Sequence, residues 1–332
     1  MARVLFVYSR KNTFTRIDRD ALAERFEVVE YFQDGPLPRV RELVSKLRSC
    51  DVVFGWFASW HTLAALNLAK AMRRPTVLVT GGFDTASVPE IGYGNQQDPI
   101  RRYRARLAIA RADRLITNSR YLEGEIERNL GIPPDRVRVV HHGLADRFGE
   151  PRGEGDGRVA LTVGAVHTWN LERKGHRAFV EAARELPDVE FVLAGGWEDD
   201  AVSELRGLAA ENVTFTGYLS DGDLDREFRR AGAYVQASWH EGFGLAVAEA
   251  MLAGCVPVVT DAGALPEVAG DTGVTIPAVD AGEVAAGVRE ALDRWPEAGL
   301  RARERVLENF PLEARANGIC EEVEAALAEA RR

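Results

Sequence analysis

The sequence predicts an α/β protein made of two doubly wound domains, each a parallel sheet covered by helices. Short β-branched runs alternate with longer helical patterns, the alternation stops once near residue 150, and it then restarts. The chain has 332 residues, a length that suits about two domains. Its apolar fraction of 46% and charged fraction of 28% are those of an ordinary globular protein, which excludes disorder as the main state.

The first half carries candidate strands separated by helical patterns. The strands are expected at Val4–Tyr8, Val28–Tyr31, Val52–Phe54, Thr76–Thr80, Arg114–Thr117 and Val137–His141. The helices are expected near Ile17–Arg25, Arg39–Arg48, Thr62–Met72, Tyr103–Ala112 and Tyr121–Asn129. Strands that alternate with helices in this way form βαβ units, and these build a parallel sheet.

A stretch rich in glycine and charge, residues 146–158, divides the chain. We therefore expect a first domain over residues 1–148, a linker over 149–158 and a second domain over 159–310, followed by a last helix over 311–332. The strands of the second domain are expected at Val159–Val163, Phe191–Ala194, Val213–Thr216, Ala233–Gln236, Val256–Thr260 and Val274–Ile276.

Charge and cysteine content exclude several function classes. The 51 acidic and 42 basic residues give a formal charge of −9, whereas proteins that bind nucleic-acid phosphates normally carry the opposite sign. Cys50, Cys255 and Cys320 lie far apart and outside any zinc pattern, which favours a reducing, cytoplasmic setting. No apolar run reaches the roughly 18 residues that span a bilayer. A place at the inner face of a membrane, with peripheral contact, stays open.

The segment Trp239–Thr260 joins two predicted strands, so its middle is expected to be the crossover helix Leu245–Ala253. Glu249 is the only polar residue of that helix. A carboxylate among apolar neighbours needs hydrogen-bond donors, because removing its water is costly. An arginine, backbone amides or ligand hydroxyls would each supply them.

Glu241 lies in the loop that leads into this helix. Gly242 and Gly244 allow the backbone to approach a ligand closely, and the amides of a helix start bind anions. This combination suits a sugar joined through a diphosphate to a nucleoside, with Glu241 on the sugar hydroxyls and Glu249 on the ribose hydroxyls. An ordinary buried glutamate paired with an arginine is the alternative.

The order of these elements resembles a known family. The two glutamates have the spacing Glu-x7-Glu around Gly242-Phe243-Gly244, and Ala253-Gly254-Cys255-Val256-Pro257 and Gly263-Ala264-Leu265-Pro266-Glu267 follow. This resembles the donor-binding signature of retaining nucleotide-sugar glycosyltransferases of the GT-B architecture, family 4. The resemblance covers nearly the whole second half and the end of the first half.

Lys174, before Gly175, stands where that family has its phosphate-binding lysine. The family often has an arginine directly after the glycine that corresponds to Gly164, but here Ala165 follows. Arg173 and His167 are the candidates to replace it.

The resemblance implies two Rossmann-like domains facing a central cleft, the first for the acceptor and the second for the donor. It implies transfer of a hexose from a nucleoside diphosphate sugar to an acceptor hydroxyl with retention of configuration, without a metal ion or further cofactor. It also implies that the last helix packs back toward the first domain. Catalytic roles fall to Glu241 and Lys174. The expected donor contacts are Gly164, Arg173, Lys174, Gly195, Tyr218, Leu219, Glu241, Gly242, Phe243, Gly244, Leu245 and Glu249.

Acceptor-side candidates follow the predicted strands of the first domain. Gly82, Asp84 and Glu90 lie in the loop after Thr76–Thr80, and loops after parallel strands carry function. Trp60 and His61 belong to an aromatic cluster after Val52–Phe54 that suits a sugar or lipid contact. Helix capping for the acids and core packing for the aromatics are the alternatives. The acceptor itself is a sugar, a lipid-linked sugar or a small molecule.

Two other functions remain alternatives. A nucleotide-sugar epimerase or phosphorylase shares the two-domain architecture but needs its own base or phosphate site. A partner subunit that binds nucleotide sugar without catalysis is the other, although Glu241, Glu249 and Lys174 together argue against it. No G-x-G-x-x-G fingerprint follows the first strand of either half, which disfavours a dehydrogenase.

Overall fold

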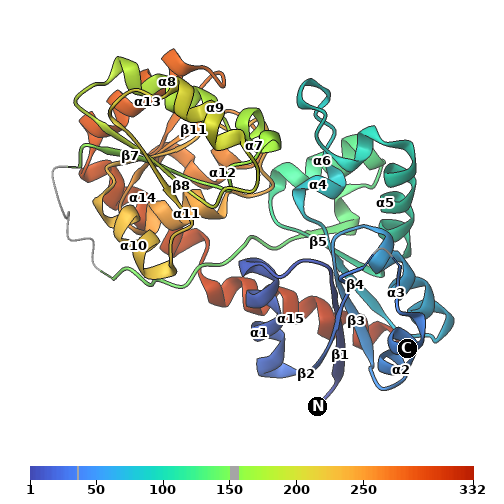
Figure 1. Ribbon diagram of the computed structural model, residues 1–332. Coiled ribbons are helices and arrows are strands. Elements are labelled where there is room, and N and C mark those ends of the chain that lie inside the picture. The colour runs from blue at the N-terminus through green and yellow to red at the C-terminus, as the bar shows by residue number, and fades with distance from the viewer. Residues whose placement is uncertain (36, 150–156) are drawn as a thin grey trace. The chain divides into compact units, whose positions relative to one another are not determined.

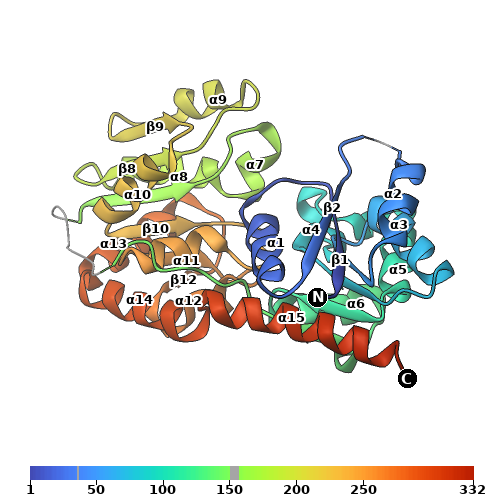
Figure 2. The same cartoon turned by 90° about the horizontal axis from the view of Figure 1, so that it is seen from below.

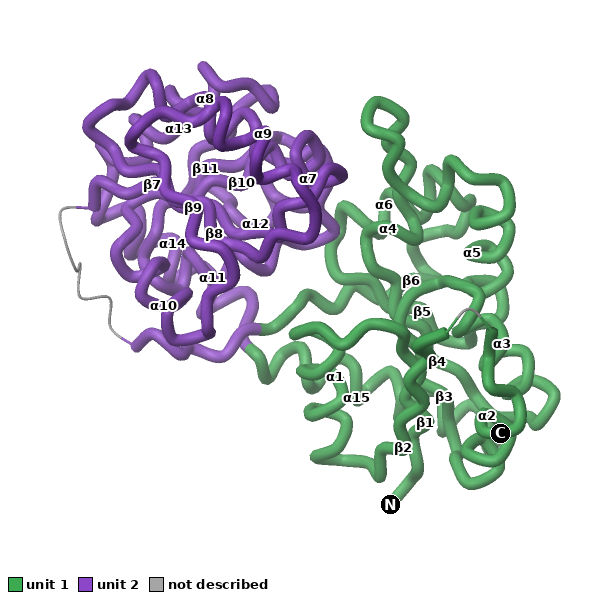
Figure 3. Tube along the Cα trace, in the orientation of Figure 1, with its two compact units in different colours: residues 1–143, 312–332 green, residues 144–311 purple. Residues whose placement is uncertain are grey.

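The computed structural model describes residues 1–35, 37–149 and 157–332, which form two compact units (Figure 1). Unit 1 contains Met1–Gly143 and Leu312–Arg332, and unit 2 contains Leu144–Pro311 (Figure 3). Each unit is built on one parallel sheet with helices, which confirms the predicted fold class of two Rossmann-like domains.

Unit 2 begins at Leu144, whereas the sequence predicts that the first domain extends to residue 148. The amide of Leu144 donates to the carbonyl of Phe310 (2.9 Å), a pairing with the far end of the same unit that the local sequence does not reveal. The predicted linker, 149–158, falls mostly on residues 150–156, which lie outside the described residues.

In the described part of unit 1, six parallel strands follow the order β2-β1-β3-β4-β5-β6. The strands are β1 (Arg3–Tyr8), β2 (Glu27–Phe32), β3 (Val52–Trp56), β4 (Thr76–Val79), β5 (Arg114–Thr117) and β6 (Val137–Val139). Val4 of β1 is opposite both Val28 and Val52, so β1 lies inside the sheet. Helices cover both faces, which explains why the strands read as continuous apolar runs. All the strands predicted for this half are confirmed, with ends within two residues.

Several helices of unit 1 begin at a residue whose side chain caps them. They are α1 (Thr13–Arg25), α2 (Val40–Arg48), α3 (Trp60–Ala71), α4 (Gly82–Thr85), α5 (Pro99–Arg111), α6 (Arg120–Leu130) and α15 (Leu312–Glu329), with 3-10 turns η1 (Pro89–Ile91), η2 (Asn95–Gln97) and η3 (Pro134–Arg136). Asn12 caps α1 by accepting from the amide of Thr15 (3.1 Å), and Asp98 caps α5. Because of these caps, α1 and α5 each begin four residues earlier than the sequence predicts.

Helix α15 belongs to unit 1, where it packs beside α1 (Figure 2). Its Arg315 is fully buried and forms a two-pronged ion pair with Asp18 of α1, through Nε–Oδ1 at 2.9 Å and Nη2–Oδ2 at 2.6 Å. The indole of Trp56 donates to the same carboxylate (3.1 Å). This network ties the end of the chain to the first domain.

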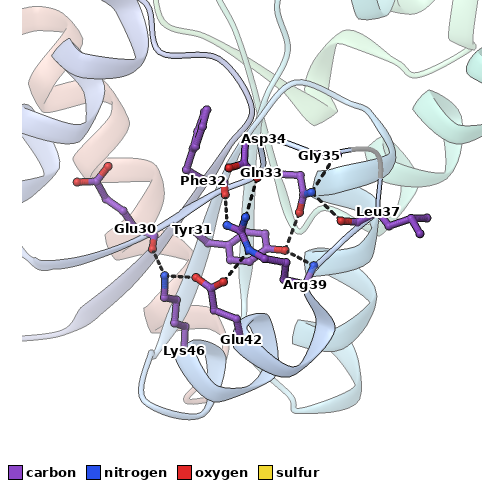
Figure 4. Close-up of polar contacts among 10 residues, drawn as sticks. All are labelled: Glu30, Tyr31, Phe32, Gln33, Asp34, Gly35, Leu37, Arg39, Glu42 and Lys46. Atoms are coloured by element: carbon purple, nitrogen blue, oxygen red, sulfur yellow. Dashed lines mark hydrogen bonds and ion pairs between the residues drawn. The ribbon is translucent and has the colours of Figure 1, made fainter.

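A surface network fixes the segment between β2 and α2 (Figure 4). The hydroxyl of Tyr31 accepts from the amide of Arg39 (2.9 Å) and donates to Gln33 (2.7 Å). The Arg39 guanidinium contacts Asp34 and Glu42. Arg39 therefore joins the end of β2 to the start of α2.

Within the described residues of unit 2, six parallel strands follow the order β12-β11-β10-β7-β8-β9. They are β7 (Val159–Val163), β8 (Glu190–Ala194), β9 (Val213–Gly217), β10 (Ala233–Gln236), β11 (Val256–Thr260) and β12 (Val274–Ile276), each within one residue of its prediction. The helices are α7 (Thr168–Arg173), α8 (His176–Ala182), α9 (Ala201–Leu208), α10 (Asp221–Arg230), α11 (Leu245–Leu252), α12 (Leu265–Ala269), α13 (Ala281–Arg294) and α14 (Glu297–Asn309), with 3-10 turns η4 (Ala183–Glu185) and η5 (Gly270–Thr272). The crossover helix predicted over Leu245–Ala253 is confirmed as α11.

No helix in the described ranges is long and apolar enough to cross a membrane. The same ranges contain no group of three or more histidine, cysteine or acidic side chains placed to hold a metal ion.

Candidate functional site

The candidate site of unit 2 is centred on the turn between β10 and α11. Gly244 caps α11 in the left-handed region (φ 102°), a conformation that glycine adopts without strain. Gly263 packs so closely beneath the turn that a Cβ there would lie 2.4 Å from the carbonyl oxygen of Glu241. The amide of Ala264 donates to that carbonyl (2.9 Å), so the segment at Gly263 and Ala264 fixes the backbone of Glu241.

The carboxylate of Glu241 lies among two cations and a hydroxyl. Its Oε1 is 3.3 Å from Nζ of Lys174, 3.7 Å from Nη1 of Arg173 and 3.3 Å from Oγ of Ser238. Burial alone would raise the pKa of Glu241, but the charges of Lys174 and Arg173 outweigh burial and lower it. The cluster therefore holds one carboxylate and two cations, an excess of positive charge that suits an anionic ligand.

The two cations are positioned by the turn between α7 and α8. Asn170 accepts from Nη2 of Arg173 (2.9 Å) and donates to the carbonyl of Ala165 (2.8 Å). The amide of Trp239 donates to the carbonyl of Arg173 (2.9 Å), which joins this turn to the loop after β10. Gly175 has φ 66°, and a Cβ there would lie 2.1 Å from the carbonyl oxygen of Ala237. Lys174 and Arg173 can reach Glu241 because glycine follows them.

Gly164 and Gly195 form a close backbone contact where β7 and β8 end. A Cβ on Gly195 would lie 1.9 Å from the carbonyl oxygen of Gly164, so no larger residue fits. A Cβ on Gly164 would lie 3.1 Å from both Lys174 Cδ and His176 Nε2. The structure thus brings together Gly164 and Lys174, two of the residues that the sequence predicts as donor contacts.

The imidazole of His176 lies beside this cluster, next to Lys174. Its side chain is 1% exposed, and neither ring nitrogen has a hydrogen-bond partner among the described residues. Burial, and then the charges of Lys174 and Arg173, lower its pKa to about 3. The neutral ring therefore fills space beside Lys174 without adding charge.

Glu249 of α11 pairs with an arginine that the sequence analysis did not identify. Its Oε1 accepts from Nη1 of Arg147 at 3.1 Å, and Nε of Arg147 also donates to Asp225 (2.7 Å). Burial raises the pKa of Glu249, Arg147 opposes this, and Asp225 and Asp221 add to the rise. Arg147 and Glu249 are 102 residues apart in sequence, so no local signal could have linked them.

The remaining donor candidates have different environments. The ring of Phe243 is 3% exposed and packs edge-on against Phe310 (5.2 Å between centroids), so it supports the turn from inside the core. Tyr218 is 83% exposed after β9, and Leu219 and Leu245 are half-buried. Gly242 is half-buried in the loop before α11.

The acceptor-side candidates lie in unit 1, where Asp84 is almost fully buried. Its Oδ2 accepts from the amide of Ala58 (2.7 Å) and so holds the turn at Phe57, which has a left-handed φ of 69°. Burial is the main cause that raises the pKa of Asp84 to about 7, although backbone amides oppose it, and the charge of Glu125 adds to the rise. Asp84 is therefore a carboxyl that can be neutral near physiological pH.

His61 lies in the first turn of α3, close to the turn that Asp84 holds, and its ring is 3% exposed. Nδ1 is 2.5 Å from Oγ of Ser59, and Nε2 is 3.0 Å from the carbonyl oxygen of Trp56. Burial lowers its pKa to about 4. Trp60 begins α3 and is half-buried, Gly82 begins α4, and Glu90 is exposed in η1. The contacts of the described residues join Asp84 to the turn just before α3, where His61 lies, but they do not join Glu90 to Asp84 or His61.

Two family models match the chain, one on each half. "Glycosyltransferase Family 4" matches residues 15–147, and "Glycosyl transferases group 1" matches residues 157–294. Together the two matched ranges include Asp84 and His61 in unit 1 and all the donor candidates in unit 2.

Curated relatives are similar to part of the chain. The O-antigen chain mannosyltransferase B of Escherichia coli is 30% identical over 202 residues, 55% of this chain and 53% of that protein. A D-inositol 3-phosphate glycosyltransferase of Mycobacterium sp. (strain JLS) is 30% identical over 223 residues, 62% of this chain and 51% of that protein. The chain spans about half the length of the curated relatives it matches.

Solved structures share the fold over the whole chain. A sucrose-phosphate synthase from Thermosynechococcus elongatus has a TM-score of 0.78 at 18% identity, covering 99% of this chain and all of that one. Anabaena Alr3699/HepE, solved in complex with UDP and glucose, has a TM-score of 0.76 at 18% identity, covering 98% of this chain and all of that one.

Proposed function

We propose that the chain is a glycosyltransferase of the GT-B fold that transfers a hexose from a nucleoside diphosphate sugar to an acceptor hydroxyl. We further propose that the anomeric configuration is retained and that no metal ion takes part. The observation that carries this proposal is the Glu241 cluster, in which Lys174 and Arg173 converge on one half-buried carboxylate beside the start of α11.

Each group of the cluster has a role in this proposal. Lys174, Arg173 and the amides at the start of α11 bind the diphosphate, because cations and a helix N-terminus both attract anions. When the diphosphate engages the cations, the carboxylate of Glu241 becomes available to accept from the sugar hydroxyls. Glu249 binds the ribose hydroxyls, with Arg147 holding its carboxylate in place.

The same groups would promote the reaction. As the bond from the anomeric carbon to the leaving oxygen breaks, negative charge grows on the diphosphate and positive charge on the sugar. Donors that are already aimed at the leaving oxygen stabilise that charge without reorganisation. Lys174 and Arg173 would therefore supply the charge compensation that a divalent cation supplies in other sites.

A thermal-shift screen tests the donor site directly. The chain is heated with the diphosphates of uridine, guanosine and adenosine and with their sugars, because a ligand that binds only the folded state raises the melting temperature. UDP sugars come first, since Anabaena HepE binds UDP and glucose. We expect a nucleoside diphosphate to stabilise wild type and to lose that effect in Lys174→Ala; no stabilisation by any of them would contradict the proposal.

Product analysis then separates the alternative functions. With donor and a pool of sugar and lipid-linked acceptors, the proposal expects a new glycoside that Glu241→Ala no longer forms. A free epimer in the absence of acceptor would instead identify an epimerase. Donor binding with the same lack of turnover in wild type and Glu241→Ala would identify a non-catalytic subunit.

A further inference from the structure

Helix α5 in unit 1 carries an unusual surface. Its sequence, Pro99–Arg111, contains five arginines and no acidic residue, in a chain whose formal charge is −9. No ion pair among the described residues includes any of these five, although many other arginines of the chain are paired. The five are Arg101, Arg102, Arg104, Arg106 and Arg111, and all are exposed.

An apolar stripe runs along the same exposed face. Ile100, Tyr103, Leu107 and Ala110 follow the spacing i, i+3, i+7, i+10, which places them in one row on a helix. Ile100 is 63% exposed and Tyr103 is 64% exposed. The opposite face, with Ala105, Ala108 and Ile109, is buried in the core of unit 1. The stripe is therefore a surface feature and not part of the core.

The arginines flank the stripe on both sides. By the helical period of 100° per residue, Arg102 and Arg106 lie along one edge, and Arg104 and Arg111 lie along the other. A hollow of about 290 Å³ opens beside the helix. It is lined by Gln96, Gln97, Pro99, Arg102, Tyr103 and Arg106. Two guanidinium groups at a small hollow suit a phosphate group.

We propose that α5 is a membrane-docking helix that lies flat on an anionic phospholipid bilayer. Ile100, Tyr103 and Leu107 would enter the boundary between head groups and acyl chains, and the flanking arginines would bind lipid phosphates. Tyrosine favours this depth because its ring is apolar and its hydroxyl is polar. The hollow beside Arg102 and Arg106 would hold one head-group phosphate.

The charge and the apolar stripe of α5 together favour an anionic bilayer over other partners. An anionic surface attracts α5 and repels a chain with a large excess of acids, so docking through this helix is favoured over other orientations. A nucleic acid would also attract the arginines, but it would leave the apolar stripe between them in contact with water. The proposal concerns unit 1 alone and stands whether or not the donor site works as proposed.

Vesicle co-sedimentation of the full chain, without donor or acceptor, tests this surface. We expect binding to vesicles that mix phosphatidylcholine with phosphatidylglycerol, weakening as salt rises, and little binding to phosphatidylcholine alone. Each arginine near an anionic surface contributes roughly fivefold in affinity, so R102Q/R106Q should bind about 30-fold more weakly. Tyr103→Ser should weaken binding as well, with the salt dependence kept.

The matched control is R289Q/R301Q, which removes the same charge from exposed positions on α13 and α14 of unit 2. It should bind within about twofold of wild type, because those arginines lie outside the docking helix. Circular dichroism checks that each variant is folded. We expect every variant to fold, because the substituted side chains are exposed. Equal binding of wild type to both kinds of vesicle, or an equal loss in the control, would overturn the proposal. The proposal would also be overturned if the chain bound a nucleic acid through α5 and did not bind vesicles.

Discussion

Each unit places a carboxylate beyond the end of a central strand, but the pKa values of the two carboxylates are shifted in opposite directions. Glu241 follows β10 in unit 2, and the cations Lys174 and Arg173 lower its pKa despite burial. Asp84 follows β4 in unit 1, where only amides oppose burial and its pKa rises to about 7. The opposite shifts follow the neighbours, because two cations lie beside Glu241, whereas the charge of Glu125 adds to the rise at Asp84.

This contrast fits two different roles. A cluster with two cations and one carboxylate is suited to a diphosphate, whose charge needs compensation. Asp84 is almost fully buried and accepts from the amide of Ala58, so it holds a turn of the protein itself.

The largest effect is expected from Lys174→Ala. It removes a cation from the leaving diphosphate, and loss of one such preorganised donor costs on the order of 10²- to 10³-fold in kcat. Steady-state kinetics with the donor identified by thermal shift measures the loss. The control is Lys70→Ala, a lysine of unit 1 that pairs with Asp113. If the kcat of Lys174→Ala stayed within about threefold of wild type, Lys174 would not stabilise the negative charge on the leaving diphosphate, and the proposed role would be contradicted.

An intermediate effect is expected from Asp84→Asn, and it depends on pH. The folded pKa, about 7, exceeds the unfolded value near 4, so the folded state binds more protons in that interval. Wild-type stability therefore loses up to about 1.4 kcal/mol per pH unit from this group as pH rises toward 7. Asparagine keeps an acceptor for the amide of Ala58 but carries no charge, so the variant avoids this loss.

Urea titrations between pH 5 and pH 8, read by pulsed hydrogen exchange in β3 and β4, measure the difference. The free energy of unfolding of Asp84→Asn relative to wild type should rise with pH up to about pH 7 and then level off. His61, whose pKa is lowered to about 4, contributes with the opposite sign, and it cancels because both proteins contain it. A pH-independent difference would show that Asp84 titrates normally.

The smallest effect is expected from Glu249→Gln. It weakens a charge-assisted hydrogen bond to the ribose, which does not react, so the KM for donor should rise about tenfold while kcat changes little. Glu204→Gln on α9, a glutamate that contacts Arg177, is the control. An unchanged KM together with a lower melting temperature would mean that Glu249 serves only its ion pair with Arg147.

The strands and the site turn could be predicted because their signals are local. Continuous β-branched runs mark strands covered on both faces. Gly244 marks the start of one short helix, α11, and Glu249 is the only polar residue within it. Helix starts were less accurate where a side-chain cap, such as Asn12 or Asp98, extends the helix beyond its apolar pattern. The Arg147–Glu249 pair and the Leu144–Phe310 pairing join distant segments, so only the fold reveals them.

The most direct test of the donor site is a calorimetric titration of the nucleoside diphosphate selected by thermal shift into Arg173→Gln and Arg177→Gln. The two arginines are close in sequence and undergo the same change, but Arg173 contacts Glu241, whereas Arg177 contacts Glu172 and Glu204. We predict that Arg173→Gln raises the Kd about tenfold or more and that Arg177→Gln stays within about twofold of wild type. Equal affinities in the two variants would contradict the claim that this cluster binds the diphosphate.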